Sequence, residues 1–212
     1  MSDARPDVLH LGCGRKRIEG AVNVDVAKIV GPDVVHDLDQ RPWPFRDDEF
    51  GEVLAYDVIE HLQDVVATLE EIHRVAREGA IVRITVPHFS SANAYTDPTH
   101  RHQFGWSSFH YFTGERDFAF ATTARFHRRA TRIVFAPTLS NRLVHRLANR
   151  YPDAYERRWA WVFPAWFLYV ELGVLKASAC RRRHREFSTS FPRCSAPPAA
   201  VSPAGPSVLR WN

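Results

Sequence analysis

Residues 8–14 read Val-Leu-His-Leu-Gly-Cys-Gly, and residues 22–25 read Val-Asn-Val-Asp. Each stretch predicts a short apolar strand; the first runs into a glycine turn and the second ends in the carboxylate of Asp25. In a doubly wound sheet the glycine turn lets a ligand approach the backbone, and a carboxylate after the second strand can bind both hydroxyls of a ribose. The pairing therefore predicts a ligand that contains a nucleoside.

The glycine turn is too short to cradle a pyrophosphate. After Gly12 and Gly14 the chain reaches Lys16, where a dinucleotide fingerprint or a P-loop would continue with more glycine. A pyrophosphate also needs the N-terminus of a helix, and no helix of useful length fits before Asn23. A nucleotide-dependent oxidoreductase is therefore disfavoured, although it stays an alternative interpretation.

Length and composition predict one domain of ordinary size. The chain has 212 residues, of which 45% are apolar, and its polar start gives no sign of a signal peptide. The three cysteines, Cys13, Cys180 and Cys194, have no metal-ligand spacing and fit a reducing compartment. We therefore expect a cytoplasmic protein in which Cys13 fills space in the glycine turn and does not act as a nucleophile.

Positive charge is concentrated at the C-terminus. The net charge is +4, but residues 181–212 contain six arginines and one glutamate, so residues 1–180 carry a net charge of −1. This balance predicts no nucleic-acid-binding face on the core. The last segment is rich in Arg, Pro, Ser and Ala, which is typical of disorder. We expect a domain over residues 1–180 and a disordered basic tail over residues 181–212.

Short apolar runs alternate with connections, a pattern typical of an α/β fold. A helix is predicted over Asp64–Arg77, with Gly79 as its left-handed cap. The first two connections have only about nine and about six residues, whereas a parallel crossover needs about a dozen. We expect the first crossover helices to be reduced to loops or single turns, which leaves one face of the sheet thinly covered. The expected strands are Val8–Gly12, Val22–Val26, Val34–Leu38, Val53–Tyr56, Ala80–Val86, Arg132–Phe135 and Tyr169–Leu175.

A histidine-rich stretch follows the fifth predicted strand. His88, His100, His102 and His110 fall within 23 residues together with Asp97, at the carboxyl edge where α/β proteins bind ligands. Three interpretations stay open. One is a general base oriented by a carboxylate, formed by His100 or His88 with Asp97. The second is a metal site of His88, Asp97, His100 and His102, and the third is a set of structural histidines.

The motifs along residues 8–86 resemble, in order and spacing, the class I S-adenosylmethionine-dependent methyltransferases, specifically the methyltransferase type 11 group. They include Leu-His-Leu-Gly-Cys-Gly at 9–14, Asn-Val-Asp at 23–25 and Asp-Val-Ile-Glu-His-Leu at 57–62. The resemblance implies a Rossmann-like class I methyltransferase fold, a seven-stranded, mostly parallel sheet in which strand seven is antiparallel. The chain departs from the family at Lys16, which replaces a third glycine.

The resemblance also implies S-adenosyl-L-methionine as the cofactor. It places the glycine turn against the methionine part, the end of strand two at the ribose, and the end of strand three at the adenine. A residue after strand four lies near the methionine end. The implied cofactor-binding residues are, in that order, Gly12, Cys13 and Gly14, then Asp25 and Val26, then Asp37 and Leu38, and finally Asp57.

The pair Glu60-His61 is placed near the cofactor by the same resemblance. His61 therefore joins His88, Asp97 and His100 as a candidate catalytic residue, with a polar pair at the start of a helix as the alternative. We expect direct, O-directed methyl transfer to a small-molecule or glycan acceptor. Weak resemblance of residues 87–112 to sugar and cell-envelope methyltransferases indicates an acceptor of that class. A non-catalytic module that binds S-adenosylmethionine is the alternative.

An apolar, aromatic run extends from Trp159 to Val170 and is too short to span a bilayer. Burial as a helix end followed by a strand is one interpretation. Peripheral membrane contact is the other, because aromatic residues beside Arg157 and Arg158 can seat a protein at a membrane surface. The aromatic residues are Trp159, Trp161, Phe163, Trp166 and Phe167.

Overall fold

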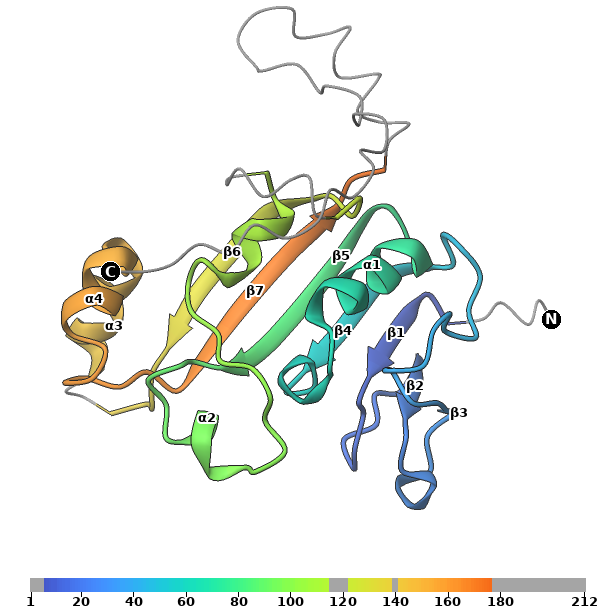
Figure 1. The fold of residues 1–212 in the computed structure, drawn as a ribbon, viewed down its shortest axis with the longest axis horizontal. Helices are drawn as coiled ribbons and strands as arrows, with labels where there is room; N and C mark the ends of the chain where they lie inside the picture. Colours follow the sequence, from blue (N-terminus) through green and yellow to red (C-terminus); the bar gives the residue numbers. More distant parts are fainter. Residues whose placement is uncertain (1–5, 115–121, 139–140, 177–212) are drawn as a thin grey trace, which may run out of the picture.

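A computed structural model describes residues 6–114, 122–138 and 141–176 of the chain. Within them, seven strands form one sheet in the order β3-β2-β1-β4-β5-β7-β6 (Figure 1). The first five strands run parallel, and β7 is antiparallel to both of its neighbours, β5 and β6. This confirms the predicted fold class. The strands are β1 (Val8–Leu11), β2 (Ala21–Asp25), β3 (Val34–Val35), β4 (Phe50–Tyr56), β5 (Ala76–Pro87), β6 (Phe126–Val134) and β7 (Phe167–Val174).

Several expected segments differ in extent, and one lies outside the described residues. The third strand is limited to Val34–Val35, and β6 begins at Phe126, six residues before its expected start. The tail expected over residues 181–212 lies outside the described residues. The connection between β6 and β7 holds two helices, α3 (Asn141–Arg150) and α4 (Pro152–Arg158).

Helix α1 (Val65–Val75) joins β4 to β5 and ends before Gly79. Asp64 caps its N-terminus, because the carboxylate accepts a hydrogen bond from Ala67 N at 2.9 Å. Gly79 is left-handed as expected, with a φ of 76°, but it lies inside β5 and does not cap the helix. The register passes from Phe50–Ala76 to Glu52–Ile81, so the residues around Gly79 form a bulge in β5.

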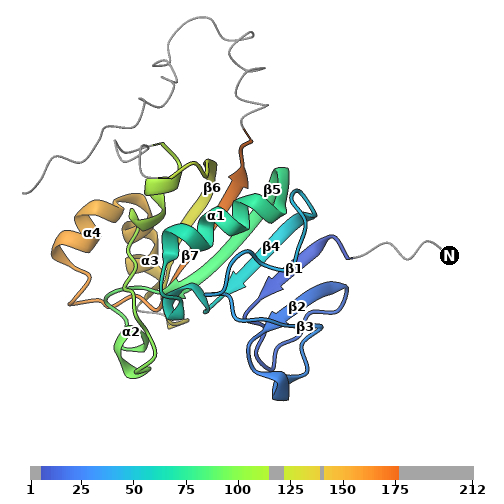
Figure 2. The same ribbon diagram turned by 45° about the vertical axis from the view of Figure 1, so that its right-hand side comes forward.

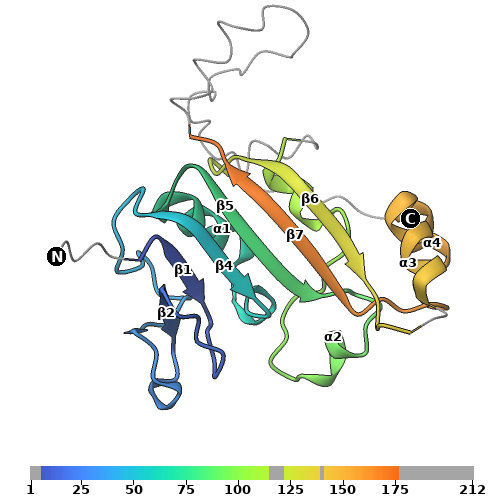
Figure 3. The same ribbon diagram turned by 180° about the vertical axis from the view of Figure 1, so that it is seen from behind.

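Only one face of the sheet is covered by a long helix. Helix α1 crosses β4 and β5 on that face (Figure 2), and no described helix covers β4, β5 and β7 on the other (Figure 3). The uncovered face carries charges on adjacent strands, because Arg83 forms ion pairs with Glu52 and Glu171. Cross-strand pairs of this kind suit a solvated sheet face. The thinly covered face that the short connections predicted is therefore confirmed.

The short connections around β2 are held by a side chain instead of a packed crossover helix. The connection from β1 to β2 has no helix, and the one from β2 to β3 has only the single turn η1 (Lys28–Val30). Asn23 is buried, accepts a hydrogen bond from Ile18 N at 2.8 Å and donates to the Asp33 carboxylate at 2.8 Å. These bonds fix the loops on both sides of β2.

The core lies between the covered face of the sheet and α1. Alternate residues of the strands point into it, as expected of a sheet with one buried face. Its fully buried side chains include Leu9, Leu11, Val53, Val82, Ile84, Leu69, Ile72, Leu168 and Leu172.

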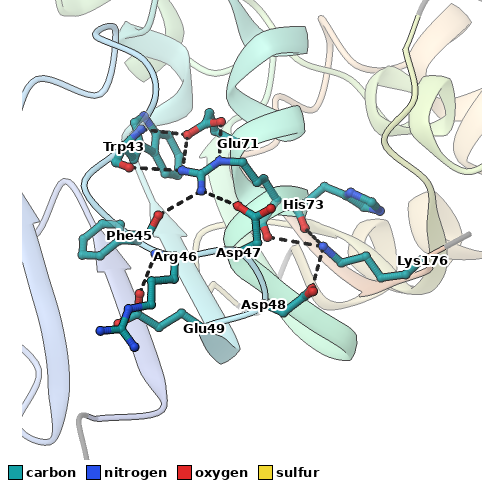
Figure 4. A network of polar contacts seen from close by, with 10 residues as sticks. Trp43, Phe45, Arg46, Asp47, Asp48, Glu49, Glu71, His73 and Lys176 are labelled. Atoms are coloured by element: carbon teal, nitrogen blue, oxygen red, sulfur yellow. Dashed lines mark hydrogen bonds and ion pairs between the residues drawn. The ribbon is translucent and has the colours of Figure 1, made fainter. Parts of the chain in front are cut away.

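A network of hydrogen bonds ties the loop before β4 to α1 (Figure 4). Arg74 donates to both carboxylate oxygens of Glu71, at 2.8 Å each, and to the carbonyl oxygens of Trp43 and Phe45. Glu71 also accepts from Trp43 N at 2.8 Å. Burial raises the pKa of the Glu71 carboxyl, but the hydrogen bonds from Arg74 and Trp43 outweigh it and leave that pKa lowered.

We predict that Arg74→Met lowers the free energy of unfolding at pH 7 by about 3 kcal/mol, because it leaves a buried carboxylate unpaired. A lowered pKa gives stability that is present above the unfolded pKa of about 4.5 and is lost as pH falls below it. Urea denaturation should therefore show the difference between wild type and variant shrinking at pH 3.5. Arg77→Met is the matched control, since Arg77 pairs with Asp7 at the surface, and it should change stability by less than about 1 kcal/mol.

Candidate functional site

The turn after β1 has a backbone that requires glycine. Gly12 and Gly14 have φ angles of 60° and 49°. A Cβ on Gly12 would lie 2.4 Å from Val58 Cγ2, so a side chain there would collide with the segment after β4. Between them, Cys13 is buried, and burial followed by the charge of Asp25 raises the pKa of its thiol. A protonated, buried thiol fits the expectation that Cys13 fills space.

Asp25 lies at the end of β2 and binds the glycine turn. One carboxylate oxygen accepts from Gly14 N at 2.8 Å and the other from Ala27 N at 2.8 Å. Each oxygen keeps a further lone pair, so the carboxylate can still accept hydrogen bonds from two ligand hydroxyls. The geometry thus joins the two motifs that the sequence analysis paired.

The residues expected around an adenine lie at the ends of β2 and β3. Asp37 is exposed and accepts from Asp39 N at 2.9 Å, whereas Leu38 is buried. Val26 is 66% exposed, and Val35, which pairs with Asp25 in the sheet, is 52% exposed. Exposed β-branched side chains at this edge offer an apolar wall to a flat ring.

Asp57 follows β4 in a left-handed conformation, with a φ of 52°. Few residues other than glycine adopt this region, and such residues gather at functional sites. Its backbone N–H donates to Thr85 O at 2.9 Å, and the Thr85 hydroxyl donates to its carboxylate at 3.1 Å. These bonds to β5 hold an exposed carboxylate at the carboxyl edge of the sheet.

Glu60 lies in the single turn η2 (Ile59–His61), directly after Asp57 and Val58. It is 1% exposed, and within the described part of the chain neither carboxylate oxygen has a hydrogen-bond partner. Burial, aided by the charges of Asp57 and Asp97, raises the pKa of Glu60 to about 8 against the effect of a backbone hydrogen bond. A buried acid without a partner, whose pKa is strongly raised by desolvation, is typical of a functional site.

His61 is linked to Asp97 through Thr99. The Thr99 hydroxyl donates to the Asp97 carboxylate at 2.6 Å, and His61 Nδ1 lies 2.8 Å from the same hydroxyl oxygen. Since the one hydroxyl proton goes to Asp97, Thr99 accepts from Nδ1–H of His61, and the ring keeps its lone pair on Nε2. Burial and the neighbouring His100 lower the pKa of His61 against the effect of Asp97, which favours the neutral ring.

His100 completes a cluster with Glu60 and His61. The two imidazole rings lie 4.7 Å apart, and His100 Nδ1 lies 3.4 Å from Ala94 O. One donor atom from each of Glu60, His61 and His100 lies within 4.8 Å of the others, a spacing that could hold a metal ion. Among the described residues this is the one such group, and the set of His88, Asp97, His100 and His102 expected from the sequence is not assembled.

His88 is fully buried at the end of β5 and does not pair with Asp97. Its Nδ1 lies 2.9 Å from the Ser90 hydroxyl and its Nε2 3.1 Å from the Glu156 carboxylate. His102 Nε2 lies 2.9 Å from Leu62 O. These positions fit structural histidines, whereas His61, His100 and Asp97 come together at the edge of the sheet.

Two residues of this cluster were missed by the sequence analysis as members of the site. Glu60 was noted only as the neighbour of His61, although a pair of polar residues straight after a buried strand was the available signal. Thr99 gave no signal, because its role depends on how the loop after β5 folds back. Arg101 N donates to Glu60 O at 2.8 Å, which anchors that loop against η2.

Comparisons with known proteins bear on the fold. Residues 9–84 match the family model described as a methyltransferase domain. No curated protein sequence matches the chain. Among solved structures, the chain is similar to an S-adenosylmethionine-dependent methyltransferase from Archaeoglobus fulgidus. The two share 16% identity with a TM-score of 0.53, and the match covers 78% of this chain and 85% of that one.

Two further structures share the fold. A methyltransferase from Mesorhizobium loti that depends on S-adenosylmethionine has 14% identity and a TM-score of 0.50, over 78% of this chain and 89% of that one. The cyclase SpnF has 14% identity and a TM-score of 0.52, over 79% of this chain and 75% of that one. At such identities the likeness concerns the fold, which is that of the class I methyltransferases.

Glu60 should make the protein less stable as pH rises. A carboxyl whose folded pKa is about 8 contributes stability that is fully present below its unfolded pKa of about 4.5 and is lost as pH rises to 8. We predict that Glu60→Gln, which cannot ionise, gains about 3–5 kcal/mol relative to wild type between pH 4.5 and pH 8. Denaturant midpoints, measured with EDTA present, give the difference, and an unchanged difference would contradict the raised pKa.

Proposed function

We propose that the protein, whose residues 9–84 match a methyltransferase-domain model and whose fold is that of the class I S-adenosylmethionine-dependent methyltransferases, transfers a methyl group to a hydroxyl of a small-molecule or glycan acceptor. The cofactor supplies the methyl group on a sulfonium. The chain must bind and orient both reactants, exclude water and remove the hydroxyl proton. The observation that carries this proposal is the Asp97–Thr99–His61 chain beside the carboxyl edge of β4.

The cofactor extends along the ends of β1, β2 and β4 in this proposal. The glycine turn, whose Gly12 leaves no room for a side chain against Val58, faces the methionine part. Asp25 accepts hydrogen bonds from the ribose while its bonds to Gly14 and Ala27 keep the carboxylate oriented. Exposed Val26 packs on the adenine.

The acceptor hydroxyl lies next to His61 Nε2. A neutral ring with a free lone pair can take the hydroxyl proton as the methyl group is transferred. Thr99 and Asp97 hold the ring by its other nitrogen, so they act as positioning residues. His100, whose ring lies 4.7 Å from that of His61, contributes a polar contact to the acceptor, whereas the carboxyl oxygens of Glu60 are buried.

A module that binds the cofactor without transferring a methyl group is the competing function. The cyclase SpnF has the same fold, so the fold by itself does not require methyl transfer. Turnover of methyl-labelled S-adenosylmethionine against a panel of sugars and sugar nucleotides separates the two functions.

Asp25 should carry the affinity for the ribose. Each hydrogen bond to a charged group contributes about 1.5–3 kcal/mol, so Asp25→Ala should weaken S-adenosylmethionine binding at least tenfold in calorimetry. Because Asp25 also holds the glycine turn, the test compares adenosine with 2′,3′-dideoxyadenosine. Wild type should prefer adenosine at least tenfold, and the variant should lose that preference. Asp153→Ala, an exposed carboxylate on α4, is the control, and an Asp25→Ala variant that still prefers adenosine would refute the ribose assignment.

His61→Ala should lower kcat by a factor of about 10² to 10⁴, the range for loss of a general base, with the cofactor Kd within twofold of wild type. Thr99→Val should lower kcat less and shift the acid limb of the pH profile, and Thr99→Ser should restore both. In wild type that limb should lie below pH 6.5, since the pKa of His61 is lowered. His127→Ala, on the uncovered face of the sheet, is the control.

The same assay decides between a base and a metal-bound acceptor. If EDTA abolishes turnover and a divalent cation restores it, Glu60, His61 and His100 hold a cation, and His61 is not the base. If EDTA has no effect and His61→Ala keeps full turnover on a verified acceptor, the role of His61 is structural.

A further inference from the structure

One end of the molecule exposes an unusual amount of large apolar side chain. Helices α3 and α4 and residues 159–166 form this end, which lies beside β6 and opposite β3 (Figure 1). One expectation was that Trp159, Trp161, Phe163 and Trp166 are buried in the core. They are exposed here, so that expectation is wrong for these four residues. We call the whole end the aromatic surface. Its exposed side chains are Leu143 (65%), Leu147 (51%), Tyr151 (57%), Trp159 (52%), Trp161 (68%), Val162 (61%), Phe163 (44%) and Trp166 (41%).

A groove of about 390 Å³ runs through this surface between α3, α4 and the segment that follows them. Side chains line it from Val144 and Leu147 on α3 to Trp159 and Phe163, and its lining is predominantly apolar. Exposed apolar patches of this kind mark contact sites for proteins or membranes.

Arginines surround the apolar side chains. Arg142, Arg146 and Arg150 recur every four residues along α3, and Arg157 and Arg158 end α4, so residues 141–166 carry five arginines against two acids. One of the two acids, Glu156, turns inward, accepting from Trp106 N and lying 3.1 Å from His88 Nε2. The charge that faces outward is therefore strongly positive.

We propose that the aromatic surface docks on an anionic membrane, with the aromatic side chains at the level of the headgroups and the arginines on lipid phosphates. Tryptophan favours the boundary between water and hydrocarbon because its ring is apolar and its N–H is polar. Arginines near such a surface attract anionic lipids. A second copy of this chain fits less well, because a two-fold contact would bring the two arginine clusters together.

The aromatic surface contacts the start of the loop that carries part of the proposed acceptor site. The first residue of β7, Phe167, pairs with Pro87, the last residue of β5, so residues 159–166 lie at the carboxyl edge of the sheet. The ring of Trp161 lies 5.6 Å from that of Phe89, at the start of the loop that carries Asp97 and His100. Docking would thus turn this loop toward the lipid.

A lipid-linked or amphiphilic acceptor suits that placement, and this part of the inference rests on the proposed function, whereas the docking does not. Among the described residues, no helix combines the length and apolar character needed to cross a bilayer. Contact with the membrane would accordingly be peripheral, made by side chains at one end of the domain.

Flotation of the full chain with vesicles tests the docking. The vesicles contain phosphatidylcholine with 30–50% phosphatidylglycerol, or phosphatidylcholine alone, at about 50 mM and about 500 mM salt, so that screening is varied. Wild type should float with the anionic vesicles at low salt and be released at high salt. The variant Arg142→Ala/Arg146→Ala should bind at least tenfold more weakly. The double variant Arg46→Ala/Arg132→Ala loses the same charge from exposed sites elsewhere and should bind like wild type.

A second variant tests the apolar contribution. Leu143→Gln/Trp161→Gln/Val162→Gln removes three exposed side chains, so folding should be unchanged by circular dichroism and binding at least tenfold weaker. Wild type that fails to float at low salt overturns the proposal. The proposal is also overturned if both surface variants bind the vesicles as the wild type does, because other parts of the chain would then be responsible for the binding. If light scattering shows that the wild type is a dimer and the triple variant a monomer, the surface binds a second copy of the chain, and the proposal is also overturned.

Discussion

The contact between Gly12 and Val58 joins the two halves of the site. One residue follows β1 and begins the cofactor turn, and the other follows β4 and precedes Glu60 and His61. Because a Cβ on Gly12 would lie 2.4 Å from Val58 Cγ2, the Gly12 backbone and the Val58 side chain approach as closely as only glycine permits. In the proposed reaction, this approach would set the distance between the transferred methyl group and His61.

The thin coverage of the sheet changes what holds β2 and β3 in place. Parallel strands are normally packed between helices on both faces. Here Asn23 and Asp33 replace such packing with directed hydrogen bonds, and Arg83 satisfies the charges of Glu52 and Glu171 on the open face. Directed bonds fix the loops at the ends of the strands, where Asp25 accepts hydrogen bonds from Gly14 N and Ala27 N.

The fold could be read from the sequence because its signals are local. The glycine turn, Asp25 and the short connections lie close together along the chain and predicted the sheet and its reduced crossovers. The polar cluster could not be read in the same way, since Thr99 meets His61, and Arg101 meets Glu60, only when the loop after β5 folds back on η2. From the sequence alone, His88 and His100 were equally good candidates for the general base. In the structure His88 is fully buried, whereas His100 is only partly buried.

The sequence of the aromatic surface was compatible both with burial in the core and with contact with a membrane. An apolar run indicates that side chains avoid water but not which neighbour covers them, and a core and a membrane satisfy the same pattern. The positions that are buried, Ala160 and Ala165, are small, so the large rings between them have no room inside and point outward. A surface selected for solubility would carry polar residues there. In our proposal, the conjunction of those rings with arginines, in contact with the start of the loop that carries Asp97, would link the choice of acceptor to the place where the protein docks.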